Sequence, residues 1–315
     1  MPIKISIALS TYNGARFLIQ QLDSLLCQTC MPLEIVVVDD CSSDRTYSIL
    51  QTYQQKYSHL FRVYRNEHNI GFVASFQKAM GLCRGTFIAL CDQDDIWLPR
   101  KLEILLCHIG NKDLVFSDAM LVDDKDIVLE NSMFKFIGRH AKTDFLSLLF
   151  ANTVTGCTLM FRKHLLDTSA FPIPSNFYAH DHYLALVAIL RQGIVFCPDA
   201  LLQYRQHDLN VIGGNKPTDD IFLKESKKKG KSYLLLLENH FFSAQFSAIE
   251  LVANYRVSLS KGLWQSQKSI FGLLKYQNGY KYLIYFYLIT GFGYRPLGKF
   301  LYNMIYRLRN ILSAS

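Results

Sequence analysis

Residues 33–40, LEIVVVDD, form a short apolar stretch that ends in two aspartates. The run of Ile and Val is not interrupted by polar residues, which indicates a strand buried on both faces. Asp39 and Asp40 stop the strand. Such a strand is typical of a parallel sheet covered by helices, so strands and helices are expected to alternate around it.

Strand-like and helix-like segments do alternate on both sides of this stretch. Strand character is found in residues 4–10, 60–66 and 85–92, and apolar residues recur at helical spacing in residues 15–29, 41–57 and 71–83. This order predicts an α/β fold with a mostly parallel sheet and helices on both faces. In such sheets, ligands bind beyond the carboxyl ends of the strands.

Polar residues gather at the ends of three predicted strands. They are Ser10, Thr11, Tyr12 and Asn13 after the first strand, Asp39 and Asp40 after the second, and Asp92, Asp94 and Asp95 after the fourth. All of them are expected at one edge of the sheet. The turn STYNGAR holds a single glycine, and the chain contains neither GxGxxG nor a Walker sequence, which argues against dinucleotide and P-loop sites.

The last of these groups lies in TFIALCDQDDIWLP, residues 86–99, where three carboxylates occupy four positions. Carboxylates this close repel one another unless a positive charge lies between them. Asp92 and Asp94 are hard oxygen donors of the kind that bind Mg²⁺ or Mn²⁺ together with phosphate oxygens. The alternative is that these aspartates cap a helix or lie in a solvated turn.

Charge is unevenly distributed along a chain whose composition, 50% hydrophobic over 315 residues, is that of a globular protein. Residues 224–315 hold 14 Lys and Arg against 3 Asp and Glu, whereas residues 1–223 hold 20 against 23. A basic region of this kind can meet nucleic acid or an anionic membrane surface. The N-terminus lacks the pattern of a signal peptide and the eight scattered cysteines suit reduced thiols, so a cytoplasmic location is expected.

Four stretches, STYNGARFL, EIVVVDDCSSDRT, NIGFVASFQKAM and GTFIALCDQDDIWLPRKL, resemble the successive signatures of family 2 glycosyltransferases, which have the GT-A fold. The stretch TGCTLMFRK and residues 178–214 resemble the acceptor-side half of the rhamnosyltransferase-like subgroup. The resemblance fades beyond about residue 215. It implies a catalytic domain over residues 1–223, with its nucleotide-binding half in about 1–110 and its acceptor half in about 111–223. Residues 224–315 are expected to form a basic, aromatic-rich helical region.

For the donor side, the resemblance implies a role for each residue of the strand-end groups. Thr11 and Tyr12 would line the base pocket, and Asp40 would accept a hydrogen bond from the N3–H of uracil or thymine. Asp92 and Asp94 correspond to the DxD element, which contacts the ribose and the metal ion. Asp95 either touches the sugar or caps the following helix.

For the reaction, the resemblance implies that Asp181 is the catalytic base. An inverting transfer needs a carboxylate that removes the proton of the acceptor hydroxyl as its oxygen attacks the anomeric carbon. Asp181 is expected at the start of a helix, where an N-cap role is the alternative. His180 and His182 flank it and could tune or replace it.

Four further residues have two interpretations each. Arg205 either contacts the diphosphate or forms a structural ion pair, and His207 either completes the metal site or lies in an ordinary loop. Trp97 is either a platform for the sugar ring or a core anchor. Gly156 either lets the backbone approach a sugar or forms an ordinary turn.

The expected function is therefore an inverting, metal-dependent transfer of a sugar, with dTDP-L-rhamnose as the favoured donor. The acceptor would be an oligosaccharide or a lipid-linked saccharide of a bacterial surface polysaccharide. The alternatives are transfer from a UDP-hexose or UDP-N-acetylhexosamine, and a non-catalytic nucleotide- or nucleic-acid-binding protein. The net acidic main domain argues against nucleic acid. The basic C-terminal region would either lie on the inner face of the cell membrane or form a homodimer interface.

Overall fold

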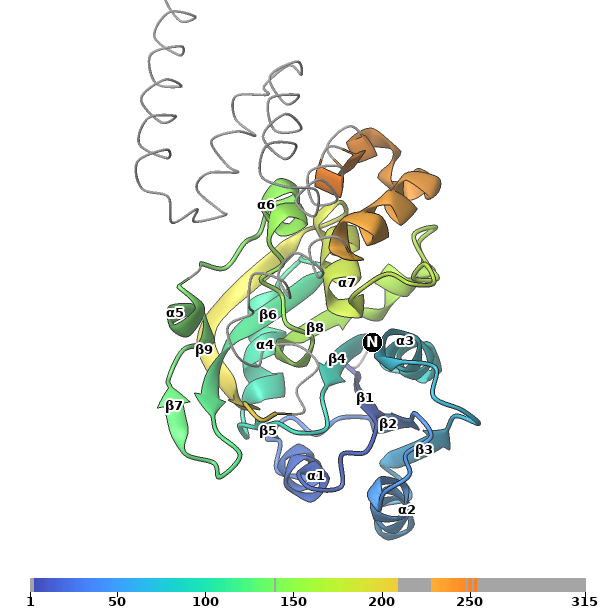
Figure 1. Ribbon diagram of the computed structural model, residues 1–315. Helices are drawn as coiled ribbons and strands as arrows, with labels where there is room; N and C mark the ends of the chain where they lie inside the picture. Colours follow the sequence, from blue (N-terminus) through green and yellow to red (C-terminus); the bar gives the residue numbers. More distant parts are fainter. Residues whose placement is uncertain (1–2, 139, 209–227, 247–248, 251, 254–315) are drawn as a thin grey trace, which may run out of the picture. The chain divides into compact units, whose positions relative to one another are not determined.

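A computed structural model describes residues 3–138, 140–208, 228–246, 249–250 and 252–253 (Figure 1). The chain divides into two compact units, Met1–Thr143 with Thr153–Lys216, and Asp144–Asn152 with Pro217–Ser315. The predicted domain boundary at residue 223 lies outside the described residues, as does most of the predicted C-terminal region.

The first unit is built on one twisted sheet with strand order β3-β2-β1-β4-β8-β6-β9-β5, and β7 pairs with β6 (Figure 1). The strands are β1 (Ile5–Thr11), β2 (Glu34–Asp39), β3 (Phe61–Arg65), β4 (Phe87–Cys91), β5 (Ile96–Trp97), β6 (Leu114–Val122), β7 (Val128–Glu130), β8 (Leu159–Arg162) and β9 (Ile194–Arg205). Strands β3, β2, β1 and β4 run parallel to one another. This half of the sheet has the arrangement that the sequence predicts.

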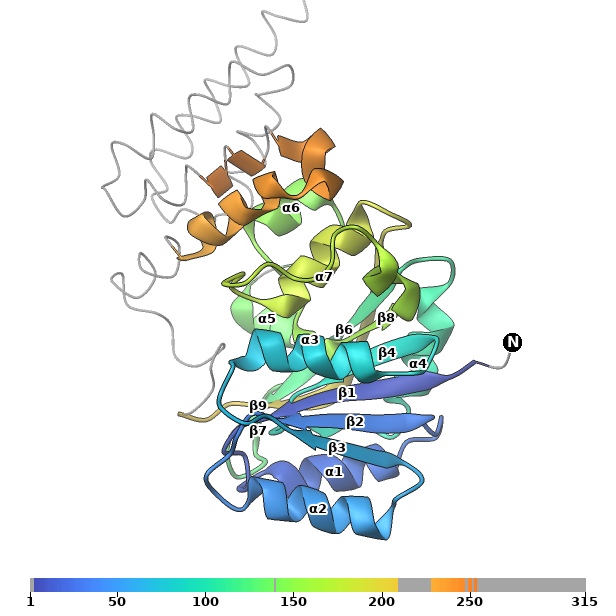
Figure 2. The same cartoon turned by 90° about the vertical axis from the view of Figure 1, so that its right-hand side faces the viewer.

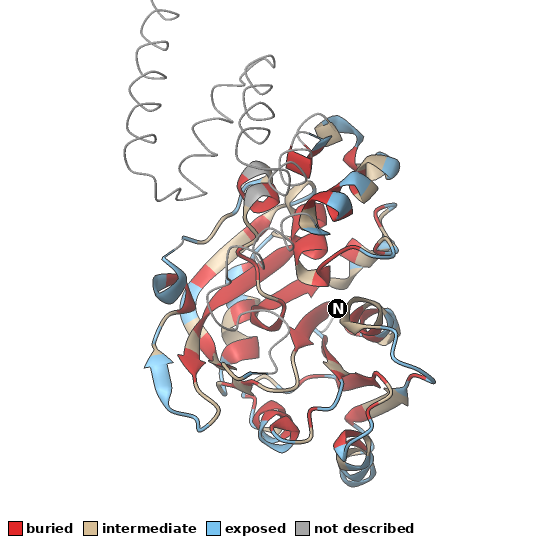
Figure 3. Cartoon of the chain, viewed as in Figure 1, coloured by how far each residue is buried: buried red, intermediate tan, exposed pale blue. Residues whose placement is uncertain are grey.

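Helices cover both faces of the parallel strands. The helices of the first unit are α1 (Leu18–Leu26), α2 (Thr46–Lys56), α3 (Phe72–Leu82), α4 (Lys101–Ile109), α5 (Met133–Ile137) and α7 (His180–Ile189), with 3-10 turns η1 (Gly156–Thr158) and η2 (Lys163–Asp167). Figure 2 shows α3 on one face of strands β1 to β3, and α1 and α2 on the other. Every residue of β2 is buried, and Figure 3 shows the same for much of the central sheet. The two-sided cover expected from LEIVVVDD is therefore confirmed.

The other half of the sheet is mixed, which the sequence does not predict. Strand β8 is antiparallel to both β4 and β6, whereas β9 runs parallel to β6 and antiparallel to β5. The β5–β9 pairing sets Ile96 opposite Gln203. The carboxyl end of β9 is thereby brought to the loop that follows β4.

The second unit contains α6 (Phe145–Phe150), η3 (Leu235–Glu238) and η4 (His240–Gln245). The side chain of Asp144 caps α6 by accepting a hydrogen bond from the N–H of Ser147. Among the residues with described positions, no helix is long and apolar enough to cross a membrane.

A buried carboxylate fastens the amino ends of three strands. Glu34 of β2 is 4% exposed and accepts hydrogen bonds from Ser6 Oγ at 2.8 Å, Arg62 Nη1 at 2.6 Å and the Arg84 N–H at 2.5 Å. Burial favours the protonated acid, but these donors outweigh it and lower the pKa of Glu34. The carboxylate thus stabilises the folded chain where it is ionised.

Glu34→Gln is expected to lower the free energy of unfolding by about 1.5–3 kcal/mol at pH 7, because hydrogen bonds to a charged acceptor are replaced. The folded pKa lies below the ordinary 4.5, so this stabilisation is present above that value and is lost as the pH falls through the folded pKa. Urea denaturation at pH 7 and at lower pH measures both effects. Glu67→Gln, at an exposed position, is the control and should keep the wild-type midpoint. Equal midpoints for both variants would show that Glu34 does not fasten the strands.

Candidate functional site

An acidic loop, residues 92–95, connects β4 to β5 at the carboxyl edge of the parallel strands. Carboxylate oxygens of Asp92 and Asp95 and the sulfur of Cys157 lie within 4.8 Å of one another. Cys157 comes from η1, a turn that is distant in sequence. The edge of the sheet therefore gathers acidic groups as the sequence predicts.

Negative charge is crowded in this loop. Burial and the charges of Asp95, Asp94 and Asp181 raise the pKa of Asp92 well above its ordinary value, and burial and Asp94 raise that of Asp95 to about 7. Asp95 Oδ1 accepts a hydrogen bond from the N–H of Arg205, whereas Oδ2 has no partner among the described residues. Crowded hard oxygen donors with an unused buried acceptor fit a divalent cation.

Asp94 and His207, both predicted to hold the metal ion, lie side by side. His207 Nε2 is 2.9 Å from Asp94 Oδ2, and both side chains are largely buried. The imidazole ring also packs on Phe17, with the ring centroids 4.9 Å apart. A carboxylate and an imidazole are ligands that suit Mn²⁺, and binding of the ion by this pair stays a prediction.

Arg205, at the end of β9, is 1% exposed and forms hydrogen bonds with the acidic loop. Its Nε donates to the carbonyl of Asp94 at 2.8 Å, and its Nη1 forms an ion pair with Asp126. The guanidinium also lies over the ring of Phe17. Arg205 therefore forms a structural ion pair, which is the second role considered for it. A contact of Arg205 with the diphosphate stays a prediction.

Gln93, which the sequence analysis passed over, ties the acidic loop to the end of β1. Its Oε1 accepts from the N–H of Tyr12 at 2.9 Å, and its Nε2 donates to the carbonyl of Tyr12 at 3.0 Å. The Tyr12 side chain itself is 48% exposed, which leaves the ring open for stacking. Thr11, by contrast, is buried and donates to Asp39. Of this predicted pair for the base pocket, only the Tyr12 ring is presented to solvent.

Asp40 is held by the loop that precedes α3. Its Oδ1 accepts from Asn66 Nδ2 and the Ile70 N–H, and its Oδ2 from the Gly71 N–H, each at 2.9 Å. Gly71 has φ of 85°, a conformation that favours glycine. Asp40 is 2% exposed, so the hydrogen bond to a pyrimidine base predicted for it remains untested.

Asp181 lies in the first turn of α7, and Ala179 rather than Asp181 is the N-cap residue. Its Oδ2 accepts a hydrogen bond from the Gly156 N–H at 3.0 Å, and its Oδ1 accepts one from the His182 N–H. A Cβ added to Gly156 would lie 3.1 Å from Nε2 of His180. A side chain at position 156 would therefore press on His180, and the backbone N–H of this residue orients the Asp181 carboxylate.

The two histidines beside Asp181 are buried. His180 stacks on Phe76 with ring centroids 4.1 Å apart, and burial lowers the pKa of His180 to about 3. It is therefore neutral at physiological pH, and among the described residues neither of its ring nitrogens has a hydrogen-bond partner. His182 Nδ1 hydrogen-bonds with the Tyr178 hydroxyl. Asp181 keeps the predicted position for a base, with neutral His180 at its side.

The structure excludes one of the two roles considered for Trp97 and one of the two considered for Asp95. Trp97 is 2% exposed and Lys101 Nζ lies 3.6 Å from its ring centroid, so the ring is a core anchor rather than a sugar platform. Helix α4 has Arg100 at its N-cap, and Asp95 does not cap it. Contact of Asp95 with the sugar stays a prediction.

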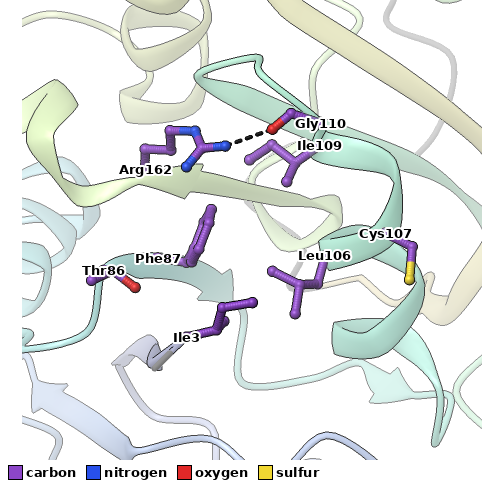
Figure 4. A pocket seen from close by; sticks show the side chains of 8 residues that line it. All are labelled: Ile3, Thr86, Phe87, Leu106, Cys107, Ile109, Gly110 and Arg162. Atoms are coloured by element: carbon purple, nitrogen blue, oxygen red, sulfur yellow. Dashed lines mark hydrogen bonds between the residues drawn. The ribbon is translucent and has the colours of Figure 1, made fainter. Parts of the chain in front are cut away.

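A separate cavity of about 400 Å³ lies away from these groups (Figure 4). It is lined by Ile3, Thr86, Phe87, Leu106, Cys107, Ile109, Gly110 and Arg162. The Arg162 guanidinium is used in hydrogen bonds to the carbonyls of Gly110 and Lys112. The cavity adjoins the start of β4, whereas the acidic loop follows the end of that strand.

Comparison with known proteins places this geometry in a family. The model described as "Glycosyl transferase family 2" matches residues 6–169. An uncharacterized glycosyltransferase of Rickettsia typhi is 26% identical over 85% of this chain and 86% of its own length. A putative teichuronic acid biosynthesis glycosyltransferase of Bacillus subtilis is 27% identical over 79% and 95%. An uncharacterized Mycobacterium tuberculosis protein is 27% identical over 209 residues, and the match spans 59% of its length.

Solved structures with a similar fold include two that were determined with a nucleotide sugar. Staphylococcus aureus TarS 1–349 in complex with UDP-GlcNAc has a TM-score of 0.59 and 22% identity, over 89% of this chain and 82% of TarS. The mannosyltransferase PcManGT of Pyrobaculum calidifontis, in complex with GDP-Man and Mn²⁺, has a TM-score of 0.58 and 15% identity, over 100% and 89%. At this identity the likeness shows the fold, which is the predicted GT-A fold.

Proposed function

Because the chain belongs to glycosyl transferase family 2, we propose that it transfers a sugar from a nucleoside diphosphate donor to an acceptor hydroxyl, with inversion and with a divalent cation. One observation carries the proposal. The Asp181 carboxylate, held by the Gly156 N–H, is near enough to the acidic loop for its charge to raise the pKa of Asp92. A base and a cation-binding loop at one sheet edge are the two groups that this reaction needs.

On the donor side, Asp94, His207 and Asp92 would hold Mg²⁺ or Mn²⁺. The bound ion would neutralise the diphosphate and so favour its departure. Tyr12 would stack on the base through its exposed ring, and Gln93 would keep that residue next to the acidic loop. Asp40 would accept a hydrogen bond from the N3–H of the base once the donor is bound.

On the acceptor side, Asp181 takes the proton from the acceptor hydroxyl while that oxygen attacks the anomeric carbon. The nucleoside diphosphate leaves from the opposite face of the sugar. Asp181 lies in the first turn of α7, where the helix dipole favours a negatively charged group. Neutral His180 adds no competing charge beside it.

We favour dTDP-L-rhamnose as the donor because TGCTLMFRK and residues 178–214 resemble the rhamnosyltransferase-like subgroup. A UDP-hexose or UDP-N-acetylhexosamine is the second candidate, and TarS, which has a similar fold, was solved with UDP-GlcNAc. The acceptor would be an oligosaccharide or a lipid-linked saccharide. The likeness to a putative teichuronic acid biosynthesis protein supports a surface polysaccharide.

Turnover in a donor panel identifies the sugar. We expect release of dTDP from dTDP-L-rhamnose with Mn²⁺ to exceed release of UDP from UDP-glucose, UDP-galactose and their N-acetyl forms. Mass spectrometry of the acceptor product should show the added deoxyhexose. Activity with a UDP-sugar alone would reject rhamnose and keep the family assignment.

The location of the enzyme is a separate proposal that rests on the basic residues 224–315, most of which lie outside the described part of the chain. We propose that this region holds the enzyme at the inner membrane surface, where a lipid-linked acceptor would be found. Flotation of the full chain with phosphatidylglycerol vesicles at low salt tests this. A chain that stays unbound and instead forms a homodimer would assign the region to assembly.

A further inference from the structure

Lys101, the first residue of α4, is fully buried beneath the acidic loop. A buried lysine is rare because its charge loses hydration, and burial lowers the pKa of Lys101 to about 8. The nearby charges of Asp95 and Asp92 oppose this effect. Lys101 therefore remains an ammonium ion at neutral pH, within the field of the cation-binding carboxylates.

The ammonium group makes two defined contacts. It donates a hydrogen bond to the carbonyl of Cys157, and it lies 3.6 Å from the centroid of the Trp97 ring. The ring face attracts the cation and Trp97 is itself buried, so the group is fixed in place. Lys101 thus connects α4 to the η1 turn.

The η1 turn is also the element that orients Asp181. Gly156, next to Cys157, donates its N–H to Asp181 Oδ2 at 3.0 Å. The turn is closed by hydrogen bonds from the N–H and the hydroxyl of Thr158 to the carbonyl of Thr155. A group that fixes the Cys157 carbonyl consequently fixes the donor to Asp181.

We propose that Lys101 is a positioning residue for the transfer reaction, since one ammonium group both offsets the charge of the acidic loop and holds the turn that aims Asp181. The inference rests on the proposed function and assigns a residue that contacts neither sugar nor nucleotide. It predicts two effects of opposite sign. Loss of the ammonium group leaves the acidic loop more negative, which should raise its affinity for a cation. It also leaves Asp181 less well oriented, which should lower kcat.

Lys101→Met replaces the ammonium group with an apolar end of similar reach. We expect kcat to fall about 10- to 100-fold, as is usual for a residue that orients reactive groups, with the donor KM close to wild type. Mn²⁺ should bind more tightly than to the wild-type chain, measured without donor by the paramagnetic resonance signal of free Mn²⁺. Lys4→Met, at an exposed position, is the matched control and should change neither quantity.

A second pair of variants tests the η1 turn without touching Lys101. Gly156→Ala places a Cβ 3.1 Å from His180 Nε2 and should lower kcat while Mn²⁺ affinity stays at the wild-type value. Gly81→Ala adds a Cβ in open space within α3 and should keep wild-type kcat. This pair keeps the turn testable if Lys101→Met fails to fold.

The readouts separate the two proposals. A wild-type chain that transfers no sugar would reject the proposed function, whereas Mn²⁺ affinity still reports on Lys101. Unchanged or weaker Mn²⁺ binding by folded Lys101→Met, or wild-type kcat in that variant, would overturn the role of Lys101. Wild-type kcat in Gly156→Ala would overturn the link through η1.

Discussion

Asp181→Asn is expected to lower kcat by about 10²- to 10⁴-fold, the usual contribution of a general base. The amide has nearly the shape of the carboxylate and can still accept a hydrogen bond from the Gly156 N–H, but it cannot take a proton. Donor affinity should stay near the wild-type value because the role proposed for Asp181 is to act on the acceptor. Steady-state kinetics and calorimetry with the nucleoside diphosphate measure the two quantities.

Asp199→Asn, an exposed carboxylate on β9, is the control for this variant and should transfer at the wild-type rate. Loss of donor affinity in Asp181→Asn would assign Asp181 to the structure of the site. A wild-type kcat in that variant would remove Asp181 as the base.

Asp94→Ala is expected to abolish most of the effect of Mn²⁺ on nucleotide binding and on turnover. The variant removes a proposed carboxylate ligand, which is also the partner of His207 at 2.9 Å. Loss of several kcal/mol of charge stabilisation corresponds to a decrease of about 10²- to 10³-fold in kcat/KM. Calorimetric titration of UDP and dTDP, with Mn²⁺ and with EDTA, tests binding directly.

Asp124→Ala is the matched control for Asp94→Ala, because Asp124 forms an exposed ion pair with Arg16 and is not among the predicted metal ligands. It should retain the effect of Mn²⁺. Equal nucleotide affinity in Mn²⁺ and in EDTA for the wild-type chain, or wild-type affinity in Asp94→Ala, would contradict a cation held by this loop.

The parallel half of the fold follows from the sequence because each strand and helix carries its own local pattern. The Val-rich stretch before Asp39 is buried on both faces in β2, as its lack of alternation indicates. The rule that ligands bind beyond the strand ends then brought Tyr12 and the acidic loop to one edge. The structure joins them directly through Gln93.

The mixed half of the sheet was not predictable in this way. Whether β8 pairs parallel or antiparallel with β4 depends on the path of the chain between them, and its four residues carry no sign of direction. The same path decides which residues reach the acidic loop. Arg205 pairs with Asp126 there and hydrogen-bonds to Gln20, which is 185 positions away in sequence.

Side-chain roles were hardest to predict where one residue type serves two purposes. Trp97 follows the acidic loop and has an aromatic ring that could support a sugar. The pairing of β5 with β9, however, places this ring in the core. Gly156 had two interpretations, a close approach to a sugar and an ordinary turn, and in the structure it lies in the η1 turn and donates its N–H to Asp181. Gln93 stood between two aspartates and gave no signal of its own, because its partner is the backbone of Tyr12.

Release of nucleoside diphosphate from a nucleotide sugar is the measurement that tests the central claim most directly. The full chain, with Mn²⁺, an oligosaccharide acceptor and dTDP-L-rhamnose or a UDP-sugar, should release the diphosphate and form a product of inverted anomeric configuration by nuclear magnetic resonance. EDTA and the Asp181→Asn variant should each reduce this release to near the background rate. Release that is unaffected by EDTA and by Asp181→Asn, or a product of retained configuration, would contradict the account.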